Sequence, residues 1–310
     1  MKNYITVDGG TTNTRVYLVK NGIIVDTEYI ELGAGSQNRE KKALEIAIKN
    51  AIRVIRARNG LTEIEIEKIL ASGMITSEFG LFELSHVSTP AGISTLHAGM
   101  KETILSDIST IPFVFLPGVK TSGADISTAD MMRGEETELY GLTDTHRRDA
   151  VYVLPGSHCK IIKTDNEGRI KDFQTTLTGE MIAALSQNTI LRDAVDLNVQ
   201  QLDTNGLLAG YKLCKKTDIN QALFKVRVLK NKFGKSKEYV YSFFMGVILH
   251  AEIESLCKTN AQCIVIGGKK QIREALQILL QQTSSAEIVA LDEETVNNAT
   301  AHGAVKIYEC

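Results

Sequence analysis

The feature that most constrains the fold is a strand pattern that occurs twice. Residues 4–32 read as a strand, a glycine-rich loop, a strand, an Asn-Gly turn and a third strand. Residues 151–176 repeat this order with a loop of other small and polar residues and with little identity of sequence. Because 310 residues suffice for two domains, the repeat predicts two similar α/β domains, at 1–146 and 147–310.

Helical periodicity fills much of the chain outside these strands. Apolar residues recur at helical spacing over 40–58 and again over 239–256. Residues 192–237 are mostly helical in pattern, so we expect a helical insert of about that extent in the second domain. A last helix begins near residue 297, and its small residues favour close helix packing at a domain hinge. They are Ala301, Gly303 and Ala304.

Composition excludes several classes of function. With 23% charged residues, a net charge of −2 and basic residues interspersed with acidic ones, the chain lacks the basic surface of a nucleic-acid-binding protein. The five cysteines are odd in number and have no C-x-x-C spacing, which argues against a disulfide framework or a zinc site and favours a reducing cytoplasm. No apolar run reaches membrane-spanning length, so we expect no membrane partner. A homo-oligomer is compatible with the sequence, which does not decide the oligomeric state.

The loop of the first meander has the composition of a phosphate-binding site. Adjacent glycines let the backbone turn sharply and approach an anion, while threonine hydroxyls and loop amides supply hydrogen-bond donors. Asp8 ends the preceding strand, and its carboxylate suits Mg²⁺, which prefers oxygen ligands. An ordinary glycine-rich turn with an exposed aspartate is the alternative. The phosphate-binding candidates are Gly9, Gly10, Thr11, Thr12, Asn13 and Arg15.

The loop of the second meander is the equivalent candidate in the second half. The hydroxyl of Ser157 and the loop amides from Gly156 onward can contact phosphate, and Lys160 can neutralise its charge. His158 is a candidate contact, although a lone histidine in a turn more often serves as a hydrogen-bonding residue. Cys159 has no nameable activating partner, so we expect it to pack rather than to react.

Two further segments of the second half end in groups suited to ligands. Gly267 and Gly268 follow a buried strand and precede a helix, so the backbone there can approach a phosphate or a flat ring closely. Glu180 comes two residues after Thr178, a natural N-cap, and either complements the helix dipole or contacts the substrate.

The acidic segment 130–141 contains the candidates for a general base. Glu135 and Glu136 would lie in the first turn of a helix, where they either complement the helix dipole or accept a proton in a cleft. Arg133 can meet an anionic substrate group through its fork of donors. Asp125 and Asp130 are other candidate bases, and the sequence does not rank the four carboxylates securely.

A loop after the strand at 67–72 supplies two hydroxyl groups. Loops at the carboxyl ends of strands are where open α/β sheets usually bind ligands. Thr76 and Ser77 can therefore donate to a sugar hydroxyl, and a helix-capping turn accounts for them equally well.

Five segments, in order and over nearly the full length, together resemble the 2-dehydro-3-deoxygalactonokinase family. The Arg-Gly-Glu-Glu-Thr and Pro-Gly-Ser-His-Cys-Lys motifs are the specific parts, whereas the first loop and the Gly267-Gly268 pair are shared with the whole actin, Hsp70 and sugar-kinase superfamily. Gly9 departs from the family, because an aromatic residue is expected there. The segments are Asp8–Arg15, Met132–Leu139, Leu154–Lys160, Leu177–Glu180 and Phe224–Arg227.

The resemblance implies both a fold and an activity. It implies two ribonuclease-H-like α/β domains flanking a nucleotide cleft, with Mg-ATP between the two hairpins and adenosine against Gly267 and Gly268. It implies ATP-dependent phosphorylation of the C6 hydroxyl of 2-dehydro-3-deoxy-D-galactonate in galactonate breakdown. A carboxylate would accept the hydroxyl proton, with Glu135 as the first candidate and Glu136 as the second. The sugar-acid carboxylate would bind Arg133 or Arg227.

Two other functions fit the residues. An exopolyphosphatase-like phosphatase of the same superfamily also has a Gly-Glu-Glu segment at the start of a helix, and it would hydrolyse its substrate without a sugar acid. A non-enzymatic actin-like ATP switch would usually need filament contacts or a peptide-binding domain, and no added domain is visible. The residues alone support phosphoryl transfer in a two-domain cleft.

Overall fold

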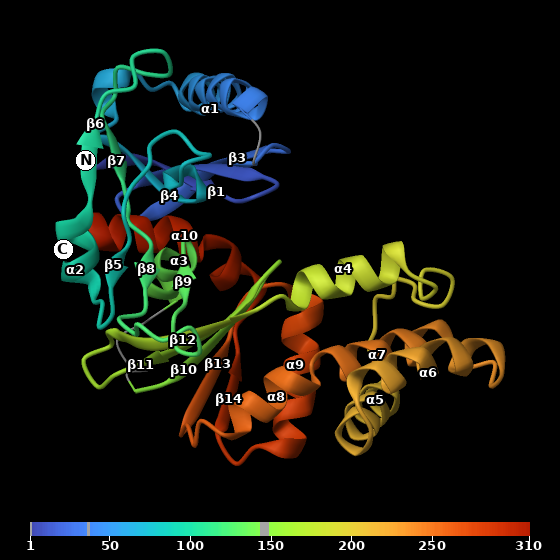
Figure 1. Ribbon diagram of the computed structural model, residues 1–310. Helices are drawn as coiled ribbons and strands as arrows, with labels where there is room; N and C mark the ends of the chain where they lie inside the picture. The colour runs from blue at the N-terminus through green and yellow to red at the C-terminus, as the bar shows by residue number, and fades with distance from the viewer. Residues whose placement is uncertain (1, 36–37, 143–148) are drawn as a thin grey trace. The chain divides into compact units, whose positions relative to one another are not determined.

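A computed structural model describes residues 2–35, 38–142 and 149–310 (Figure 1). The chain divides into two compact units. The first comprises Met1–Arg148, Asp165–Phe173 and Glu294–Cys310, and the second comprises Asp149–Thr164 and Gln174–Glu293.

The first unit is built on a six-stranded sheet of order β3-β2-β1-β4-β7-β6. The antiparallel meander β1-β2-β3 lies at one edge, and β4 and β7 extend it in parallel with β1. An antiparallel β6 completes the sheet. The strands are β1 (Asn3–Gly9), β2 (Thr14–Lys20), β3 (Ile23–Ile30), β4 (Lys68–Gly73), β6 (Lys101–Thr103) and β7 (Phe113–Phe115).

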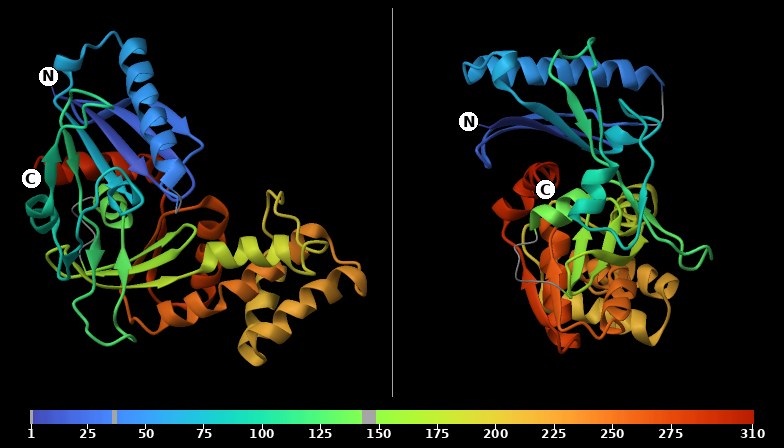
Figure 2. Two further views of the ribbon diagram at one scale, coloured as in Figure 1. Left: turned by 45° about the horizontal axis from the view of Figure 1, so that its top comes forward. Right: turned by 90° about the vertical axis from the view of Figure 1, so that its left-hand side faces the viewer.

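Helices cover both faces of this sheet (Figures 1 and 2). α1 (Asn38–Arg58) buries Leu44, Ile48, Ile52 and Ile55, which lie on one stripe of the helix and join the core with apolar side chains of the strands. Burying each such side chain stabilises the fold by roughly 1.5–3 kcal/mol. On the other face lies α10 (Glu293–Tyr308). The Tyr17 hydroxyl of β2 donates to the Asn297 carbonyl of this helix at 3.0 Å, and the Tyr4 hydroxyl of β1 donates to Glu309, the residue after the helix, at 2.9 Å.

α10 also packs on α3 (Glu135–Leu142) with the backbones in contact. A Cβ atom on Gly303 would lie 1.9 Å from the carbonyl oxygen of Thr137, so the crossing needs glycine there. The sequence-based division placed residues 147–310 in one domain. The structure instead assigns residues 294–310 to the first unit, because this close crossing holds the last helix on α3. It also assigns residues 165–173 to the first unit, where Ile170 forms an antiparallel bridge with Ala91.

Smaller elements complete the first unit. A three-stranded sheet has the order β5-β8-β9, and the Tyr140 hydroxyl of α3 donates to the Ala91 carbonyl at 2.7 Å. The elements are the 3₁₀ helices η1 (Glu63–Glu65) and η2 (Met74–Thr76), the helix α2 (Ile93–Gly99), and the strands β5 (Val87–Ser88), β8 (Val119–Lys120) and β9 (Met131–Met132).

The second sheet repeats the order of the first. Its order is β12-β11-β10-β13-β14, with β10 antiparallel to β11 and parallel to β13, and β13 parallel to β14. In both sheets the first strand of the meander therefore pairs with a parallel strand on its other side, which confirms the predicted repeat. The strands are β10 (Val151–Pro155), β11 (Cys159–Thr164), β12 (Ile170–Thr176), β13 (Cys263–Ile266) and β14 (Glu287–Ala290).

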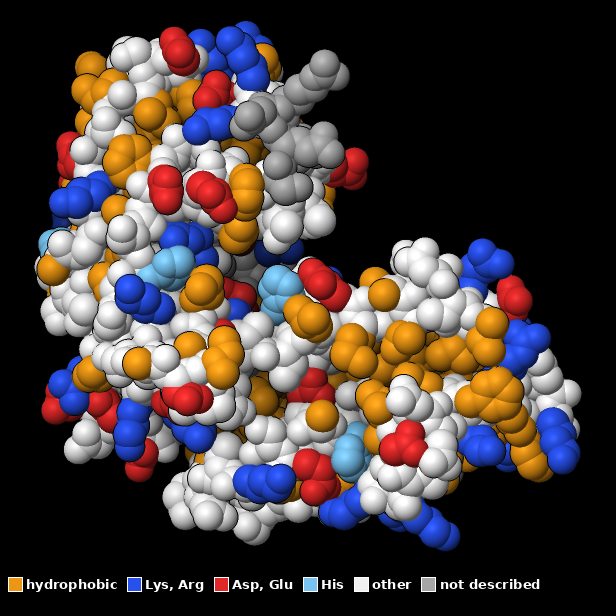
Figure 3. All heavy atoms as spheres, in the orientation of Figure 1, with side chains coloured by type: hydrophobic (Ala, Val, Ile, Leu, Met, Phe, Trp, Pro, Cys, Tyr) orange, Lys and Arg blue, Asp and Glu red, His pale blue; other side chains and the backbone are white. Residues whose placement is uncertain are grey.

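Helices of the second unit pack around α7, which is buried from Val240 to Ile248. α5 and α7 touch through glycine: a Cβ on Gly210 would lie 2.0 Å from the Phe243 carbonyl oxygen. Apolar side chains are exposed over the region of α4 and α6 in Figure 3. Among the exposed large apolar residues of this unit are Leu177, just before α4, and Phe224, on α6. The helices are α4 (Thr178–Asn188), α5 (Thr204–Lys216), α6 (Ile219–Asn231), α7 (Lys237–Ile248), α8 (His250–Cys257) and α9 (Lys270–Thr283).

The single helix predicted over 239–256 is two helices. α7 ends and α8 begins at Leu249, whose ψ of −2° departs from the α-helical value, and the axes bend by 48°. Within the described residues, no single helix is both long enough and apolar enough to cross a membrane. Only α7 and α8 taken together, across this bend, have that length and composition.

Candidate functional site

The first hairpin presents an exposed loop at the end of β1. Asp8 pairs with Arg15 and Gly9 with Thr14, and the Gly10 amide closes the loop by donating to the Asn13 carbonyl at 2.8 Å. The loop threonines, Thr11 and Thr12, are exposed, so their hydroxyls are accessible to a ligand. The buried Thr14 hydroxyl instead donates to a carbonyl of the chain, that of Leu32, at 2.9 Å.

Three glycines from separate parts of the chain lie together beside this hairpin. A Cβ on Gly9 would lie 2.7 Å from the Cβ of Ile75, which explains why the aromatic residue expected in relatives does not fit here. Gly73, at φ +82°, packs against the Gly9 carbonyl oxygen, and Gly134, at φ +113°, packs against Gly73. The ends of β1 and β4 and the start of α3 therefore meet, because none of these positions carries a side chain.

This convergence gathers carboxylates around Asp8, which is partly buried. The pKa of Asp8 is raised to about 6, mainly by burial and also by the charge of Glu135. The charge of Arg15 and a hydrogen bond with Thr300 act in the opposite direction and lower this pKa. Burial likewise raises the pKa of Glu138 to about 8, and the charges of Glu135 and Asp8 raise it further. Sequence reasoning missed Glu138 and Thr300. The position of Glu138 three residues after Glu135 on the same helix was an available signal for the first.

The arrangement suits a divalent cation whose remaining coordination positions are filled by water and substrate. Among the described residues, no group of three His, Cys, Asp or Glu side chains is placed to hold a metal ion. Mg²⁺ usually binds one or two carboxylates together with waters and substrate phosphates, and a single aspartate at a strand end fits that requirement.

The two candidate bases on α3 have different surroundings. Glu136 is fully buried, and its two carboxylate oxygens accept the Gly134 amide at 2.8 and 2.9 Å. Burial, followed by the charge of Glu135, raises the pKa of Glu136 to about 8. Glu135 is partly exposed, and its Oε2 accepts the Arg133 amide at 3.1 Å. Glu136 therefore caps its own helix, and Glu135 is the better placed of the two to meet a substrate.

Arg133 ties the start of α3 to the segment after β4. Its Nη1 donates to the Thr76 carbonyl at 2.8 Å and to the Thr76 hydroxyl at 2.6 Å, and its Nη2 donates to the Leu84 carbonyl at 2.8 Å and faces His86. Burial lowers the pKa of Arg133. Thr76 is fully buried, and the Ser77 hydroxyl donates to a backbone carbonyl of the same turn at 2.6 Å. The structure thus gives these three predicted substrate contacts internal partners.

The second hairpin lies against the start of α4. The Gly156 amide donates to the His158 carbonyl at 2.9 Å, and Ser157 is exposed. The Ser157 carbonyl accepts the Glu180 amide at 3.0 Å, and a Cβ on Gly179 would lie 2.1 Å from the Gly156 carbonyl oxygen. The predicted candidates Ser157 and Glu180, which come from two separate motifs, are therefore neighbours in this unit.

The remaining side chains of the second hairpin turn to protein partners. The ring Nε2 of His158 lies 3.1 Å from Glu180 Oε1. Lys160 is 4% exposed, and its ammonium donates to the Thr175 hydroxyl at 2.7 Å. Cys159 is fully buried, and burial raises the pKa of its thiol, so a reactive thiolate is disfavoured.

The glycine pair after β13 lies beside the second hairpin. The Gly267 amide donates to the Val153 carbonyl at 2.9 Å, and Gly268, at φ +65°, packs so closely on Pro155 that a Cβ would lie 2.3 Å from its carbonyl oxygen. Arg273, in the first turn of α9 and 5% exposed, donates to the Gly268 carbonyl at 2.6 Å and also binds Glu293. Sequence reasoning missed this arginine, which fixes the loop from the helix side.

The other candidates have local structural contacts. Arg227 lies on α6 and donates to the Ile190 carbonyl at 3.2 Å. Asp125 lies in an exposed loop, where hydrogen bonds from the Ser127 hydroxyl and amide lower its pKa. Asp130 accepts the amide of the next residue at 2.7 Å.

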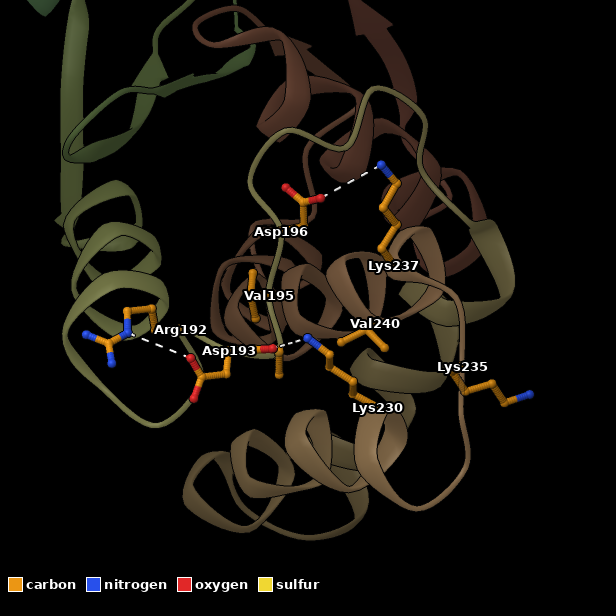
Figure 4. A pocket seen from close by; sticks show the side chains of 9 residues that line it. Arg192, Asp193, Val195, Asp196, Lys230, Lys235, Lys237 and Val240 are labelled. Atoms are coloured by element: carbon orange, nitrogen blue, oxygen red, sulfur yellow. Dashed lines mark hydrogen bonds and ion pairs between the residues drawn. The ribbon is translucent and has the colours of Figure 1, made fainter.

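A hollow of about 350 Å³ in the second unit contains none of the predicted site residues. Figure 4 shows two of its three lysines pairing within it, Lys237 with Asp196 at 3.8 Å and Lys230 with the backbone of Asp193. It is lined by Arg192, Asp193, Ala194, Val195, Asp196, Lys230, Lys235, Lys237 and Val240.

The repeated sheet order and the hairpins at the ends of β1 and β10 give the chain a fold of the actin, Hsp70 and sugar-kinase type. The fold matches the ADPNP-bound activator of the 2-hydroxyisocaproyl-CoA dehydratase from Clostridium difficile, with a TM-score of 0.53 and 16% identity over 98% of this chain and 93% of that one. The chain belongs to the 2-keto-3-deoxy-galactonokinase family, whose model matches residues 8–307.

Two relatives agree with this assignment. The chain is 28% identical over 256 residues to the 2-dehydro-3-deoxygalactonokinase of Escherichia coli strain K12, covering 82% of this chain and 80% of that protein. A crystal structure from Sinorhizobium meliloti, of a protein assigned as a 2-dehydro-3-deoxygalactonokinase, shares the fold with a TM-score of 0.79 and 19% identity over 98% and 97% of the two chains. The family and fold expected from the sequence are confirmed.

Proposed function

We propose that the protein is a kinase that transfers the γ-phosphoryl group of ATP to the C6 hydroxyl of 2-dehydro-3-deoxy-D-galactonate. The observation that carries the proposal is the family match from residue 8 to residue 307, which includes both hairpins and the carboxylates of α3. The Escherichia coli relative carries this activity in its name.

Each hairpin is assigned a role in binding ATP. The exposed hydroxyls of Thr11 and Thr12 and the amides of the first loop would donate to phosphate oxygens, with Arg15 contributing positive charge. Ser157 and its loop would do the same from the second unit. The backbone at Gly268 would approach the adenosine, because no side chain screens it.

Asp8 is assigned to Mg²⁺, together with water and the ATP phosphates. When bound, the ion would neutralise charge on the transferred group. Glu135 would accept the proton of the sugar hydroxyl as the oxygen bonds to the γ-phosphorus and ADP leaves. The terminal nitrogens of Arg133 donate to carbonyls of the protein, so we assign Arg133 the role of holding η2 against α3. The carboxylate of the substrate would then bind Arg227 or backbone amides.

A coupled assay of ADP release tests the function. Purified protein with Mg-ATP is incubated with 2-dehydro-3-deoxy-D-galactonate, with its epimers and without any sugar acid. We expect ADP release only with a keto-deoxy sugar acid, and a product phosphorylated at C6 by NMR. Release of phosphate in the absence of a sugar acid would favour a phosphatase and overturn the proposal, as would ATP binding without turnover of any sugar acid.

A further inference from the structure

The carboxylate of Glu252 joins two threonines at the start of α4. Glu252 lies on α8 and is 4% exposed. Its Oε1 accepts the hydroxyl of Thr176 at 2.8 Å and also that of Thr178, and the two hydroxyls lie 2.7 Å apart. Thr176 ends β12 and Thr178 begins α4, so one oxygen atom of α8 fixes the junction between the strand and the helix.

The start of α4 is held by this contact and by the second hairpin rather than by a side-chain cap. Its N-cap position is Leu177 rather than Thr178, so the N-cap expected from the sequence is wrong by one residue. Leu177 is 55% exposed and cannot accept a hydrogen bond through its side chain. The Glu180 amide donates instead to the Ser157 carbonyl at 3.0 Å, and Gly179 packs on the Gly156 carbonyl oxygen. The position of the helix start therefore sets the position of the hairpin loop.

Burying the carboxylate of Glu252 is energetically unfavourable, which indicates that it positions its neighbours rather than stabilises the fold. The second oxygen of Glu252, Oε2, is buried and has no hydrogen-bond partner among the described residues. Burial raises the pKa of the nearby Cys159 thiol, and the charge of Glu252 raises it further. A buried carboxylate with one unpaired oxygen is a poor source of stability, whereas buried polar contacts can define one arrangement of the elements they join.

We propose that Glu252 is a positioning residue for the phosphate-binding hairpin of the second unit. Through Oε1 it holds Thr176 and Thr178, through them the start of α4, and through α4 the loop at residues 156–158. This inference rests on the proposed function, because it takes the loop to contact ATP. Glu252 acts on the loop through its contacts with Thr176 and Thr178.

Substitutions at Glu252 separate geometry from charge. Glu252→Gln keeps an oxygen that can accept both hydroxyls, and we expect the KM for ATP to stay within about twofold of wild type. Glu252→Ala leaves two buried hydroxyls without their acceptor, and we expect the KM for ATP to rise about tenfold while the KM for the sugar acid stays unchanged.

Glu254→Ala is the matched control. Glu254 lies on the same helix, and its carboxylate accepts the Tyr211 hydroxyl at 2.7 Å and the Lys215 ammonium at 2.9 Å, on α5 rather than α4. Its removal also deletes a carboxylate from α8, but it should leave both KM values unchanged. If Glu254→Ala and Glu252→Ala raise the KM for ATP equally, the specific role of Glu252 is refuted.

Hydrogen exchange tests the inference without any activity. We expect the amides of residues 156–158 and 178–181 to exchange at least tenfold faster in Glu252→Ala than in wild type, and at the wild-type rate in Glu252→Gln. Thr178→Val keeps the side-chain shape without the hydroxyl and serves if Glu252→Ala does not fold. Unchanged exchange in Thr178→Val and Glu252→Ala overturns the inference. A wild-type protein without kinase activity refutes the proposed function alone.

Discussion

Gly141 and Ala299 touch backbone to backbone: a Cβ atom on Gly141 would lie 1.7 Å from the carbonyl oxygen of Ala299. With Gly303 against Thr137, this contact fixes the crossing of α3 and α10. α3 carries Glu135 and Glu138, and α10 carries Thr300, so the crossing sets the distances within the carboxylate group around Asp8.

The crossing predicts that Gly141→Ala destabilises the protein. Helix propensity alone predicts a gain of up to about 1 kcal/mol for alanine over glycine in a helix. The clash with Ala299 reverses the sign, and we expect a loss of about 2–3 kcal/mol in the free energy of unfolding. Urea denaturation measures it, with the exposed Glu294→Ala on α10 as the control. A stabilised Gly141→Ala variant would contradict the crossing.

Much of the architecture follows from local sequence signals. The two meanders were predictable because alternating apolar residues and tight turns act over a few residues, and Gly10 and Gly156 each close their loops with a single short contact. The break at Leu249 was not predictable, because the apolar pattern runs through it without interruption.

The candidate site was predictable in its backbone loops and less so in its side chains. Motif spacing located the hairpins, but it did not reveal that Arg133 donates to Thr76 and Leu84 or that Glu136 turns back to Gly134. These partners lie up to 57 residues apart, and only tertiary packing brings them together. The assignment of α10 to the first unit has the same cause.

Asp8→Asn should separate activity from stability. Loss of the charge should lower kcat by about 100-fold or more if Asp8 holds Mg²⁺. The pKa of Asp8 is raised from 3.8 to about 6, so the folded state binds the extra proton between these values, and the ionised group destabilises the fold above pH 6. The variant should therefore be about 1–2 kcal/mol more stable than wild type at pH 8.

Activity assays and thermal unfolding at pH 8, on the same samples, check both parts. Near-normal turnover of Asp8→Asn would remove Asp8 from the metal role. Lower stability at pH 8 would show that the carboxylate is not penalised by its surroundings.

The two carboxylates at the start of α3 should respond differently to amide substitution. Glu135→Gln should lower kcat by about 100-fold or more, because the group is partly exposed and is the proposed base. Glu136→Gln should keep most of the activity, because its carboxylate is buried against the Gly134 amide. Steady-state kinetics on both variants measures this, and the reverse ranking would make Glu136 the base.

Glu136 and Glu138 should also make stability depend on pH. Their pKa values are raised from 4.5 to about 8, so the folded state binds more protons than the unfolded chain between these values. Their contribution is complete below pH 4.5 and is lost as the pH rises to 8, so the free energy of unfolding should fall across this window. Glu138→Gln removes one of the titrating groups and should flatten the decline.

Urea denaturation at pH 6 and pH 9 measures the difference, with Glu294→Gln as the exposed control. An equal decline in wild type and Glu138→Gln would mean that Glu138 titrates as it does in water, and the carboxylate group around Asp8 would then be more open to solvent than its packing indicates.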